Sequence, residues 1–239
     1  MGKDVIIACD FKSKEETVGF LSVFGDERPF LKIGMELFYA EGPAICRDLK
    51  ERGHALFLDL KVHDIPNTVK RTMVVLARLG VDMVNVHAAG SRAMMEAARE
   101  GLAEGSKEDG YGKICSPLLI AVTQLTSINQ KSLNEELLIP GPMEDAVAAY
   151  ARRAREAGLD GVVCSAREAG AVHDLCGKSF LTVTPGIRFA EEEKGDQKRV
   201  MTPKEAGAAG ADYIVVGRSI CGAKNPRLAY HRCLEDFLG

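Results

Sequence analysis

One short pattern occurs three times along this chain of 239 residues: a glycine, an aspartate two residues later, and then an apolar run rich in β-branched residues. The copies are LGVDMVNVHA, AGLDGVVCSA and AGADYIVVGR, at Leu79–Ala88, Ala157–Ala166 and Ala209–Arg218. A glycine in this position typically ends a helix, and the run after it favours a buried strand. The pattern therefore predicts a helix-to-strand unit that recurs along the chain.

Similar apolar runs predict eight strands, with helical patterns between them, such as the one at Asp145–Ala157. The predicted strands are Val5–Asp10, Phe30–Gly34, Ala55–Lys61, Met83–His87, Leu118–Thr123, Gly161–Ser165, Leu181–Thr184 and Tyr213–Gly217. Strands that alternate with helices within this length favour an α/β fold, a (β/α)8 TIM barrel that forms a single domain over residues 1–239. A doubly wound parallel sheet stays open as the alternative, because periodicity alone does not distinguish the two folds.

Charge and cysteine content disfavour several classes of protein. The formal net charge of −3 gives no reason to expect nucleic acid or an anionic membrane as a partner, and no apolar run is long enough to span a bilayer. The seven cysteines are dispersed, so we expect neither a zinc site nor a disulfide framework, and we expect a reducing, cytoplasmic compartment. His87 ends a predicted strand, where a packed histidine is a better interpretation than a metal ligand.

The segment FLDLKVHDIPNTV (Phe57–Val69) places charged residues at the end of a predicted strand. Because side chains alternate along a strand, Asp59 and Lys61 share one face, while the apolar residues that alternate with them face the surrounding helices. Opposite charges on the inner face of a buried strand are costly unless they pair or take part in chemistry. This segment, with Asp64 in the loop that follows, is therefore the best candidate for an active site.

Two more charged residues stand at comparable places: Asp10 at the end of the first predicted strand and Lys32 inside the second. In a barrel, catalytic residues lie at the C-terminal ends of the strands. Each residue also has a structural alternative. Asp10 and Asp64 would cap the helices that follow them, and Asp59 would form a structural ion pair with Lys61. Five charged residues at equivalent places favour catalysis, because a buried charged cluster is often no more stable than apolar packing.

The last two predicted strands end in patterns that suit a bound anion. TPGIR (Thr184–Arg188) closes the seventh strand and VVGRSI (Val215–Ile220) closes the eighth. Gly186 and Gly217 permit close approach of the backbone to a ligand, and Arg218 adds a charge that can bind two oxygens at once. The loops after these two strands are the usual phosphate site of a barrel, so we expect a phosphate there.

With these segments the chain resembles the shorter, bacterial kind of orotidine 5′-monophosphate decarboxylase. The most specific segment is DLKVHDIPNTV, and it is supported by LKIGMELF, VTQLTS, TPGIR, GDQKR and VVGRSI, so the resemblance runs from Asp10 to Arg218. It implies a homodimer with active sites at the subunit interface and orotidine 5′-monophosphate as the small-molecule substrate. The polar run Ala190–Arg199, otherwise a solvated loop, would then be a lid over the ligand.

The resemblance also implies roles for individual residues. Lys32, Asp59, Lys61 and Asp64 of the partner subunit would form an alternating charged network. Asp10 and Lys32 would hold the ribose, together with Thr68 of the partner subunit. Ile65 of the partner subunit would lie beside the departing carboxylate, and Thr126 would bond the pyrimidine. Gln197 would lie between lid, base and phosphate, Gly217 and Arg218 would bind the phosphate, and Arg188 would be a further binding residue.

The implied reaction removes CO₂ from C6 of orotidine 5′-monophosphate and leaves uridine 5′-monophosphate, in pyrimidine biosynthesis, with no cofactor or metal expected. The Lys61 ammonium would stabilise the C6 carbanion and then protonate it, while Asp59 and Asp64 keep it charged and in place. Two alternatives stay open. One is a Mg²⁺-dependent decarboxylase or aldolase of keto-sugar phosphates from the same superfamily, in which a glutamate is expected where Lys32 stands. The other is a non-catalytic barrel that binds nucleotides.

Overall fold

The computed structural model describes residues 3–107, 116–191 and 200–239. Its parallel strands form a closed barrel in the order β1 to β8, with β8 paired back to β1. They are β1 (Asp4–Cys9), β2 (Phe30–Gly34), β3 (Leu56–Val62), β4 (Met83–His87), β5 (Leu118–Val122), β6 (Gly161–Val163), β7 (Leu181–Thr184) and β8 (Tyr213–Val216). Closure confirms the predicted (β/α)8 barrel and rules out the doubly wound sheet, which has two open edges.

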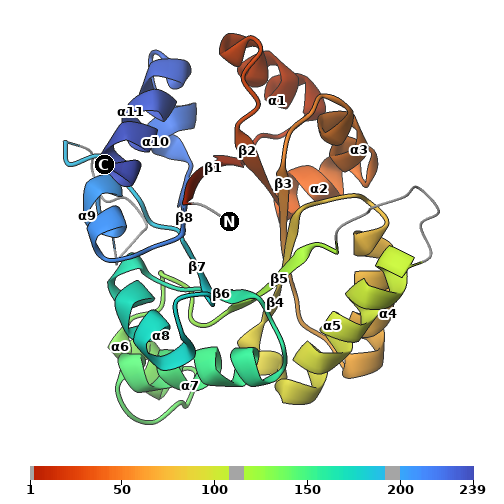
Figure 1. The fold of residues 1–239 in the computed structure, drawn as a ribbon, viewed down its shortest axis with the longest axis vertical. Helices are drawn as coiled ribbons and strands as arrows, with labels where there is room; N and C mark the ends of the chain where they lie inside the picture. The colour runs from red at the N-terminus through yellow and green to blue at the C-terminus, as the bar shows by residue number, and fades with distance from the viewer. Residues whose placement is uncertain (1–2, 108–115, 192–199) are drawn as a thin grey trace.

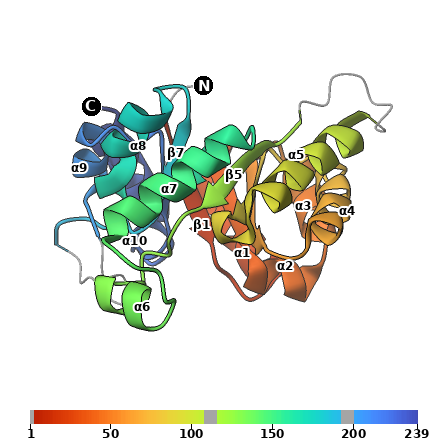
Figure 2. The ribbon, with the colours of Figure 1, turned by 90° about the horizontal axis from the view of Figure 1, so that it is seen from below.

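Helices surround the strands, as Figure 1 shows with the barrel at the centre and Figure 2 shows from the side. The α-helices are α1 (Lys14–Leu21), α2 (Met35–Glu41), α3 (Ala44–Glu51), α4 (Pro66–Ala77), α5 (Arg92–Lys107), α6 (Gln130–Glu135), α7 (Met143–Glu156), α8 (Ala169–Cys176), α9 (Pro203–Ala208), α10 (Arg218–Cys221) and α11 (Pro226–Leu238). Short 3₁₀ turns are η1 (Ser22–Phe24), η2 (Ala88–Gly90) and η3 (Ala166–Glu168). The helix predicted at Asp145–Ala157 is α7. No helix within the described ranges is long and apolar enough to cross a membrane.

Two apolar layers hold the barrel together. The outer layer lies between the strands and the helices and includes Val5, Ile7 and Leu58. A separate inner layer fills the barrel with side chains from alternate strand positions: Ile6, Ala8, Phe57, Met83, Ile120, Val183, Tyr213 and Val215. This division follows from strand geometry, because successive side chains point to opposite faces. The inner layer also supplies the floor on which a ligand site can rest.

The aspartates of the repeated pattern share one role at the N-terminal rim of the barrel. Each precedes an even-numbered strand, and one of its carboxylate oxygens accepts the backbone N–H of the neighbouring odd-numbered strand. The pairs are Asp82 with Leu56, Asp160 with Leu119 and Asp212 with Thr182, each at 2.7 Å. These bonds satisfy backbone donors at the strand starts, which explains why the pattern recurs.

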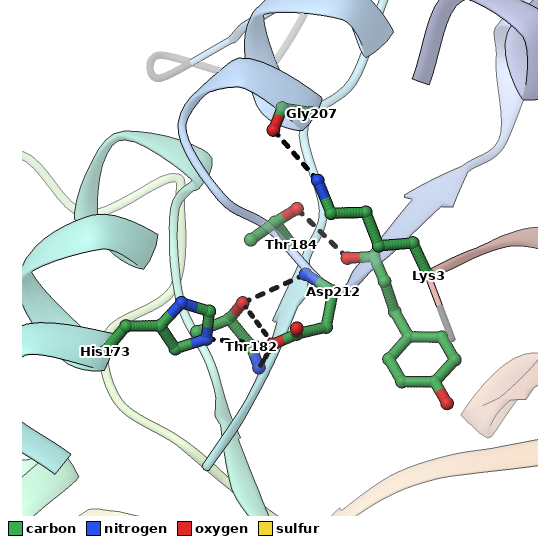
Figure 3. A network of polar contacts seen from close by, with 7 residues as sticks. Lys3, His173, Thr182, Thr184, Gly207 and Asp212 are labelled. Carbon is green, nitrogen blue, oxygen red and sulfur yellow. Dashed lines mark hydrogen bonds and ion pairs between the residues drawn. The ribbon is translucent and has the colours of Figure 1, made fainter. Parts of the chain in front are cut away.

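The same oxygen of each aspartate also contacts a basic side chain from the helix before the odd-numbered strand. The basic partners are Lys50 of α3 at 2.7 Å, Arg99 of α5 at 2.6 Å and His173 of α8 at 3.0 Å. At the third position the Thr182 hydroxyl donates to Asp212 as well, and Figure 3 shows this network between α8, β7 and the start of β8. We call the three aspartates with these partners the rim clamps.

Helix α4, which follows the charged segment, is held close to α5 by two glycines of α5. A Cβ at Gly101 would lie 2.2 Å from the Lys70 carbonyl oxygen, and a Cβ at Gly105 would lie 2.5 Å from the Val74 carbonyl oxygen. Real Cβ atoms do not approach backbone atoms so closely, so only glycine permits this packing. The close contact packs the middle of α4 directly against α5.

Candidate active site

A cavity of about 530 Å³ opens at the C-terminal ends of the strands. Its floor is apolar and includes the upper members of the inner layer, whereas its walls are charged and polar. The lining residues are Ala8, Phe57, Val122, Val163, Cys164, Val183 and Val215 among the apolar ones, and Asp10, Lys32, Asp59, Lys61, Gln124, Thr126, Ser127, Arg188 and Arg218 among the polar ones. An apolar floor with a few convergent charges is typical of a small-molecule site.

Four of the predicted residues form one alternating array of charges in this cavity. Lys32 Nζ lies 2.9 Å from Asp10 Oδ1 and 3.5 Å from Asp59 Oδ2. Lys61 Nζ lies 2.7 Å from Asp59 Oδ1. The carboxylate of Asp59 therefore stands between two ammonium groups, with one oxygen directed to each.

Burial makes this array electrostatically strong. Asp59 and Lys32 are each 8% exposed. Burial acts to raise the pKa of Asp59, but Lys32 and Lys61 outweigh it, so the pKa lies below the ordinary value of an aspartate. Burial acts to lower the pKa of Lys32, but Asp59 and Asp10 outweigh it, so that pKa lies above its ordinary value. Both groups are therefore charged at neutral pH.

The backbone at Lys61 leaves the regular strand conformation. Lys61 has a φ of 51°, in the left-handed region, which costs a non-glycine residue roughly 1–2 kcal/mol. The pairing of β3 with β4 shifts in register between Leu58 and Val62 at the same place. The alternation of side chains predicted the face of Lys61 correctly, but it contained no signal for this bend.

The two helix-capping alternatives for the aspartates are wrong. The side chain of Ser13, not Asp10, caps α1 by accepting the N–H of Glu16. Asp10 is directed instead to Lys32. The residue before α4 is Ile65, with no side-chain capping bond, and Asp64 Oδ1 accepts only the N–H of its neighbour Ile65 among the bonds of the described residues.

Three predicted residues lie outside the cavity of their own chain. Asp64, Ile65 and Thr68 are all exposed, and 67% of Ile65 is accessible. They stand at the end of β3 and the start of α4, beside the cavity rather than in it. Gln197 falls outside the described residues, as does most of the run Ala190–Arg199.

The predicted phosphate end joins the same cavity. Gly186, Arg188, Gly217 and Arg218 all line it, and Thr126 lines it from the loop after β5. Gly186 has a φ of 82°, which favours glycine, and allows the turn after β7. Gly217 has a negative φ of −105°, and a Cβ at this position would meet only the Ala8 Cβ, at 3.5 Å, so its value to a ligand is an uncovered backbone.

His87 is a partly buried histidine next to the array. Its ring lies 5.6 Å from the ring of His63, and its pKa is lowered by burial first, then by His63 and Lys61. It is therefore neutral at neutral pH. Across the described ranges, no group of three or more His, Cys, Asp or Glu side chains is arranged to hold a metal ion.

Sequence reasoning missed three polar residues of the site. Gln124 and Ser127 line the cavity, and Asn85 lies against the charged array with 1% of its surface exposed. A signal for Asn85 was present, because Met83, Asn85 and His87 alternate in MVNVH as Phe57, Asp59 and Lys61 do in the strand beside it. Alternation places Asn85 on the inward face of its strand, so the cost of burying a polar side chain applies to it as it does to Asp59.

The comparisons with known proteins agree with one another. The model of the "Orotidine 5′-phosphate decarboxylase / HUMPS family" matches residues 3–233. Orotidine 5′-phosphate decarboxylase of Geobacillus thermodenitrificans is 56% identical over 98% of this chain and 96% of its own, and that of Bacillus caldolyticus is 57% identical over 98% and 94%. The crystal structure of orotidine 5′-phosphate decarboxylase from Lactobacillus acidophilus is 40% identical, with a TM-score of 0.88 over 99% of this chain and 100% of that one.

Proposed function

The chain belongs to the orotidine 5′-phosphate decarboxylase / HUMPS family, and from this premise we propose how it acts on orotidine 5′-monophosphate. It is a carboxy-lyase of pyrimidine biosynthesis that converts this nucleotide into uridine 5′-monophosphate and CO₂. The whole chain, residues 1–239, acts as a single barrel domain. Its catalytic groups are Lys32, Asp59, Lys61 and Asp64.

One observation carries this proposal: a buried carboxylate stands between two ammonium groups on an apolar floor. Lys61 Nζ is 2.7 Å and Lys32 Nζ is 3.5 Å from the oxygens of Asp59. Such an array is costly to bury and fixes the ammonium groups without any motion during the reaction. Preorganised charge of this kind stabilises a developing anion better than water does.

The reaction then follows from the position of Lys61. The bond between C6 and the carboxylate carbon breaks, and its electron pair stays on C6 as CO₂ leaves. The Lys61 ammonium stabilises this pair and donates a proton to it, which forms the C6–H bond of the product. Lys61 regains a proton from solvent when the product leaves. Asp59 supports each step by holding the ammonium in place, with Nζ 2.7 Å from its Oδ1.

The rest of the cavity holds the nucleotide. Asp10 and Lys32 bind the ribose hydroxyls, and Thr126 bonds the pyrimidine. Arg188, Gly217, Arg218 and Gln197 hold the phosphate end. Because the phosphate is remote from C6, its binding energy can order the charged site without contact to the reacting bond.

We also propose that the active form is a homodimer in which each subunit completes the site of the other. Asp64, Ile65 and Thr68 are exposed beside the cavity of their own chain, which supports a role in the neighbouring subunit. There Asp64 of the partner subunit would extend the array beyond Lys61, and Ile65 of the partner subunit would make the pocket for the departing carboxylate apolar. The protein would work in the cytoplasm, where the thiols of its six described free cysteines stay reduced.

The first experiment is an assay of purified protein with orotidine 5′-monophosphate in the presence of EDTA, followed by absorbance. Turnover is expected, and it would also exclude the Mg²⁺-dependent alternative. Activity only on keto-sugar phosphates after Mg²⁺ is added would overturn the assignment. Tight binding of uridine 5′-monophosphate without turnover of the substrate would favour the non-catalytic barrel.

Mixing two inactive variants tests the shared site. Lys61→Ala and Asp64→Ala each disable every site of their own homodimer. In a mixed dimer one site keeps both wild-type residues if Asp64 acts across the interface, so mixing the subunits restores activity. If Asp64 acts in its own subunit, mixing restores nothing, and the proposal of a shared site is wrong.

A further inference from the structure

Asn85 lies in the middle of β4, next to β3, on the inward face of the barrel. Its side chain is almost completely buried, with 1% exposed, and it does not line the cavity formed by the described residues. A buried amide is costly unless its donor and its acceptor both find partners. The position therefore demands an explanation other than contact with a ligand.

Both ends of the Asn85 amide bind the charged segment of β3. Its Nδ2 donates to Asp59 Oδ1 at 2.6 Å, and its Oδ1 accepts the backbone N–H of Lys61 at 2.7 Å. The two bonds fix which end of the amide is oxygen, since a carboxylate accepts and an N–H donates. One side chain thus holds the carboxylate of Asp59 and the backbone of Lys61 at once.

The backbone bond coincides with the bend in β3. Leu58 pairs with Val84, and the next pair is Val62 with Val86, so β3 takes four residue steps where β4 takes two. The Lys61 N–H is bound by the side chain of Asn85 in this irregular stretch, where Lys61 adopts its φ of 51°. A strained conformation persists only when the surroundings stabilise it, and Asn85 supplies that stabilisation.

The hydrogen bond from Asn85 to a side chain acts on Asp59, the acidic partner of Lys61. Asp59 Oδ1 accepts from Asn85 and from Lys61 Nζ, so Asn85 sets the rotation of the carboxylate that faces Lys61. With both bonds in place, the root and the tip of the Lys61 side chain are fixed relative to one rigid strand. Placement within a fraction of an ångström is what proton donation to a transient carbanion requires.

We infer that Asn85 is a positioning residue for the decarboxylation: it holds Asp59 and the left-handed backbone of Lys61 so that the ammonium is directed at C6. This inference rests on the proposed function. It assigns Asn85 no contact with the substrate, so it predicts an effect on the chemical step and not on the binding of the nucleotide.

The test compares Asn85→Ala with the wild-type enzyme, with Thr182→Val as the matched control. Thr182 is also buried on a barrel strand, and its hydroxyl donates to Asp212 in a rim clamp far from Lys61. For Asn85→Ala we expect kcat to fall about 100-fold, while KM and the Kd of uridine 5′-monophosphate stay within about threefold. The control loses stability and keeps kcat.

A kcat for folded Asn85→Ala within about threefold of wild type would overturn the inference, and so would a parallel loss of kcat and nucleotide affinity. If Asn85→Ala does not fold, Asn85→Leu takes its place, because it nearly keeps the size of the side chain and removes both hydrogen bonds without adding a charge. It is expected to fold with a similarly reduced kcat. Failure of both variants to fold would assign Asn85 to stability and would also overturn the inference.

A second measurement uses no substrate and separates this inference from the proposed function. Unfolding equilibrium constants are compared for Asn85→Ala, Asp59→Ala and the double variant, with Asn85→Leu replacing Asn85→Ala if needed. We expect the double variant to differ at least about fivefold from the product of the single effects. Independent effects would show that Asn85 does not hold Asp59. Lack of turnover by the wild-type enzyme would reject the proposed function alone.

Discussion

Each end of the barrel carries a Lys–Asp ion pair of the same length, but the surroundings of the two pairs differ. At the N-terminal rim, Lys50 Nζ lies 2.7 Å from Asp82, and at the C-terminal rim, Lys61 Nζ lies 2.7 Å from Asp59. Asp82 also accepts the backbone N–H of Leu56 at the start of β3, where the pairing of β3 with β4 is still regular. Asp59 stands between two lysines, and the strand bends into a left-handed conformation beside it.

The difference teaches that distance alone does not distinguish a structural ion pair from one that we propose to be catalytic. A rim clamp is partly exposed and tied to backbone, so its charges are satisfied and its geometry repeats three times. The array at the other end concentrates charge on an apolar floor and depends on a strained residue. A buried array beside a strained residue marks the C-terminal rim as the functional end, whereas the rim clamps mark the N-terminal rim as the structural end. The predictions below test that division.

The largest expected effect follows from removing the lysine at the functional end. Lys61→Ala removes the ammonium that we propose stabilises and protonates C6, so kcat is expected to fall by several orders of magnitude while the fold persists. The control is Lys50→Ala, which breaks an ion pair of the same length in a rim clamp. It is expected to lower the free energy of unfolding and to leave kcat unchanged. Steady-state kinetics and urea unfolding of both variants measure the contrast, and near-wild-type turnover by Lys61→Ala would reject the assignment of Lys61.

Arg218 sharpens the comparison within the C-terminal end of the barrel, where we propose that phosphate binding and chemistry use different residues. Arg218→Ala removes a cation from the phosphate end but leaves the array intact, so KM is expected to rise about 100-fold, more than kcat falls. Arg227→Ala is the control, since this exposed arginine pairs with Glu27 away from the cavity. An unchanged KM for Arg218→Ala would contradict the phosphate role.

The sequence predicted most of this architecture because its rules are local. Strand alternation correctly placed Asp59 and Lys61 on the inner face, and the repeated glycine and aspartate correctly marked the helix-to-strand steps. The glycines Gly80, Gly158 and Gly210 indeed have positive φ values of 70°, 77° and 89°. What the pattern did not reveal is the reason for the aspartate, because its partners are Leu56, Leu119 and Thr182 on another strand.

The missed features have a common physical cause, which is that they depend on contacts between strands. The bend at Lys61 arises from the register shift against β4, and Asn85 gains its role only from that pairing. The capping alternatives failed for a similar reason. Asp10 is drawn to Lys32 of β2, and a nearer residue, Ser13, caps the helix. Alternation gives the face of a side chain, but not the partner that it meets there.

At the structural end, removing one aspartate is expected to change stability alone. Asp160→Ala leaves the Leu119 N–H and Nη2 of Arg99 without their carboxylate acceptor, so the free energy of unfolding is expected to fall by about 2 kcal/mol. Asp160→Asn keeps an acceptor for the N–H and is expected to lose less. Denaturant titration measures both, and kcat per folded molecule stays at the wild-type value. A drop in kcat for folded Asp160→Ala would show that the two ends are coupled.

The smallest expected effect concerns pH and a buried histidine at the structural end. His54 is 4% exposed, with Nδ1 3.0 Å from the Pro29 carbonyl oxygen, and burial lowers its pKa, with Arg28 and Arg52 adding to the effect. Below the unfolded pKa of about 6.5, the unfolded chain binds a proton that the folded chain does not.

Stability must therefore fall as the pH drops from about 6.5 toward the lower pKa of the folded state. His54→Asn keeps a donor for the carbonyl but does not titrate, so its free energy of unfolding is expected to fall less than that of wild type between about pH 7.5 and pH 5.5. Urea titrations at the two pH values measure the difference. Equal falls would show that other groups carry the acid sensitivity. Because His54 lies in the structural end, the ratio of kcat between variant and wild type is expected to be the same at both pH values, and a ratio that changes with pH would break the division between the two ends.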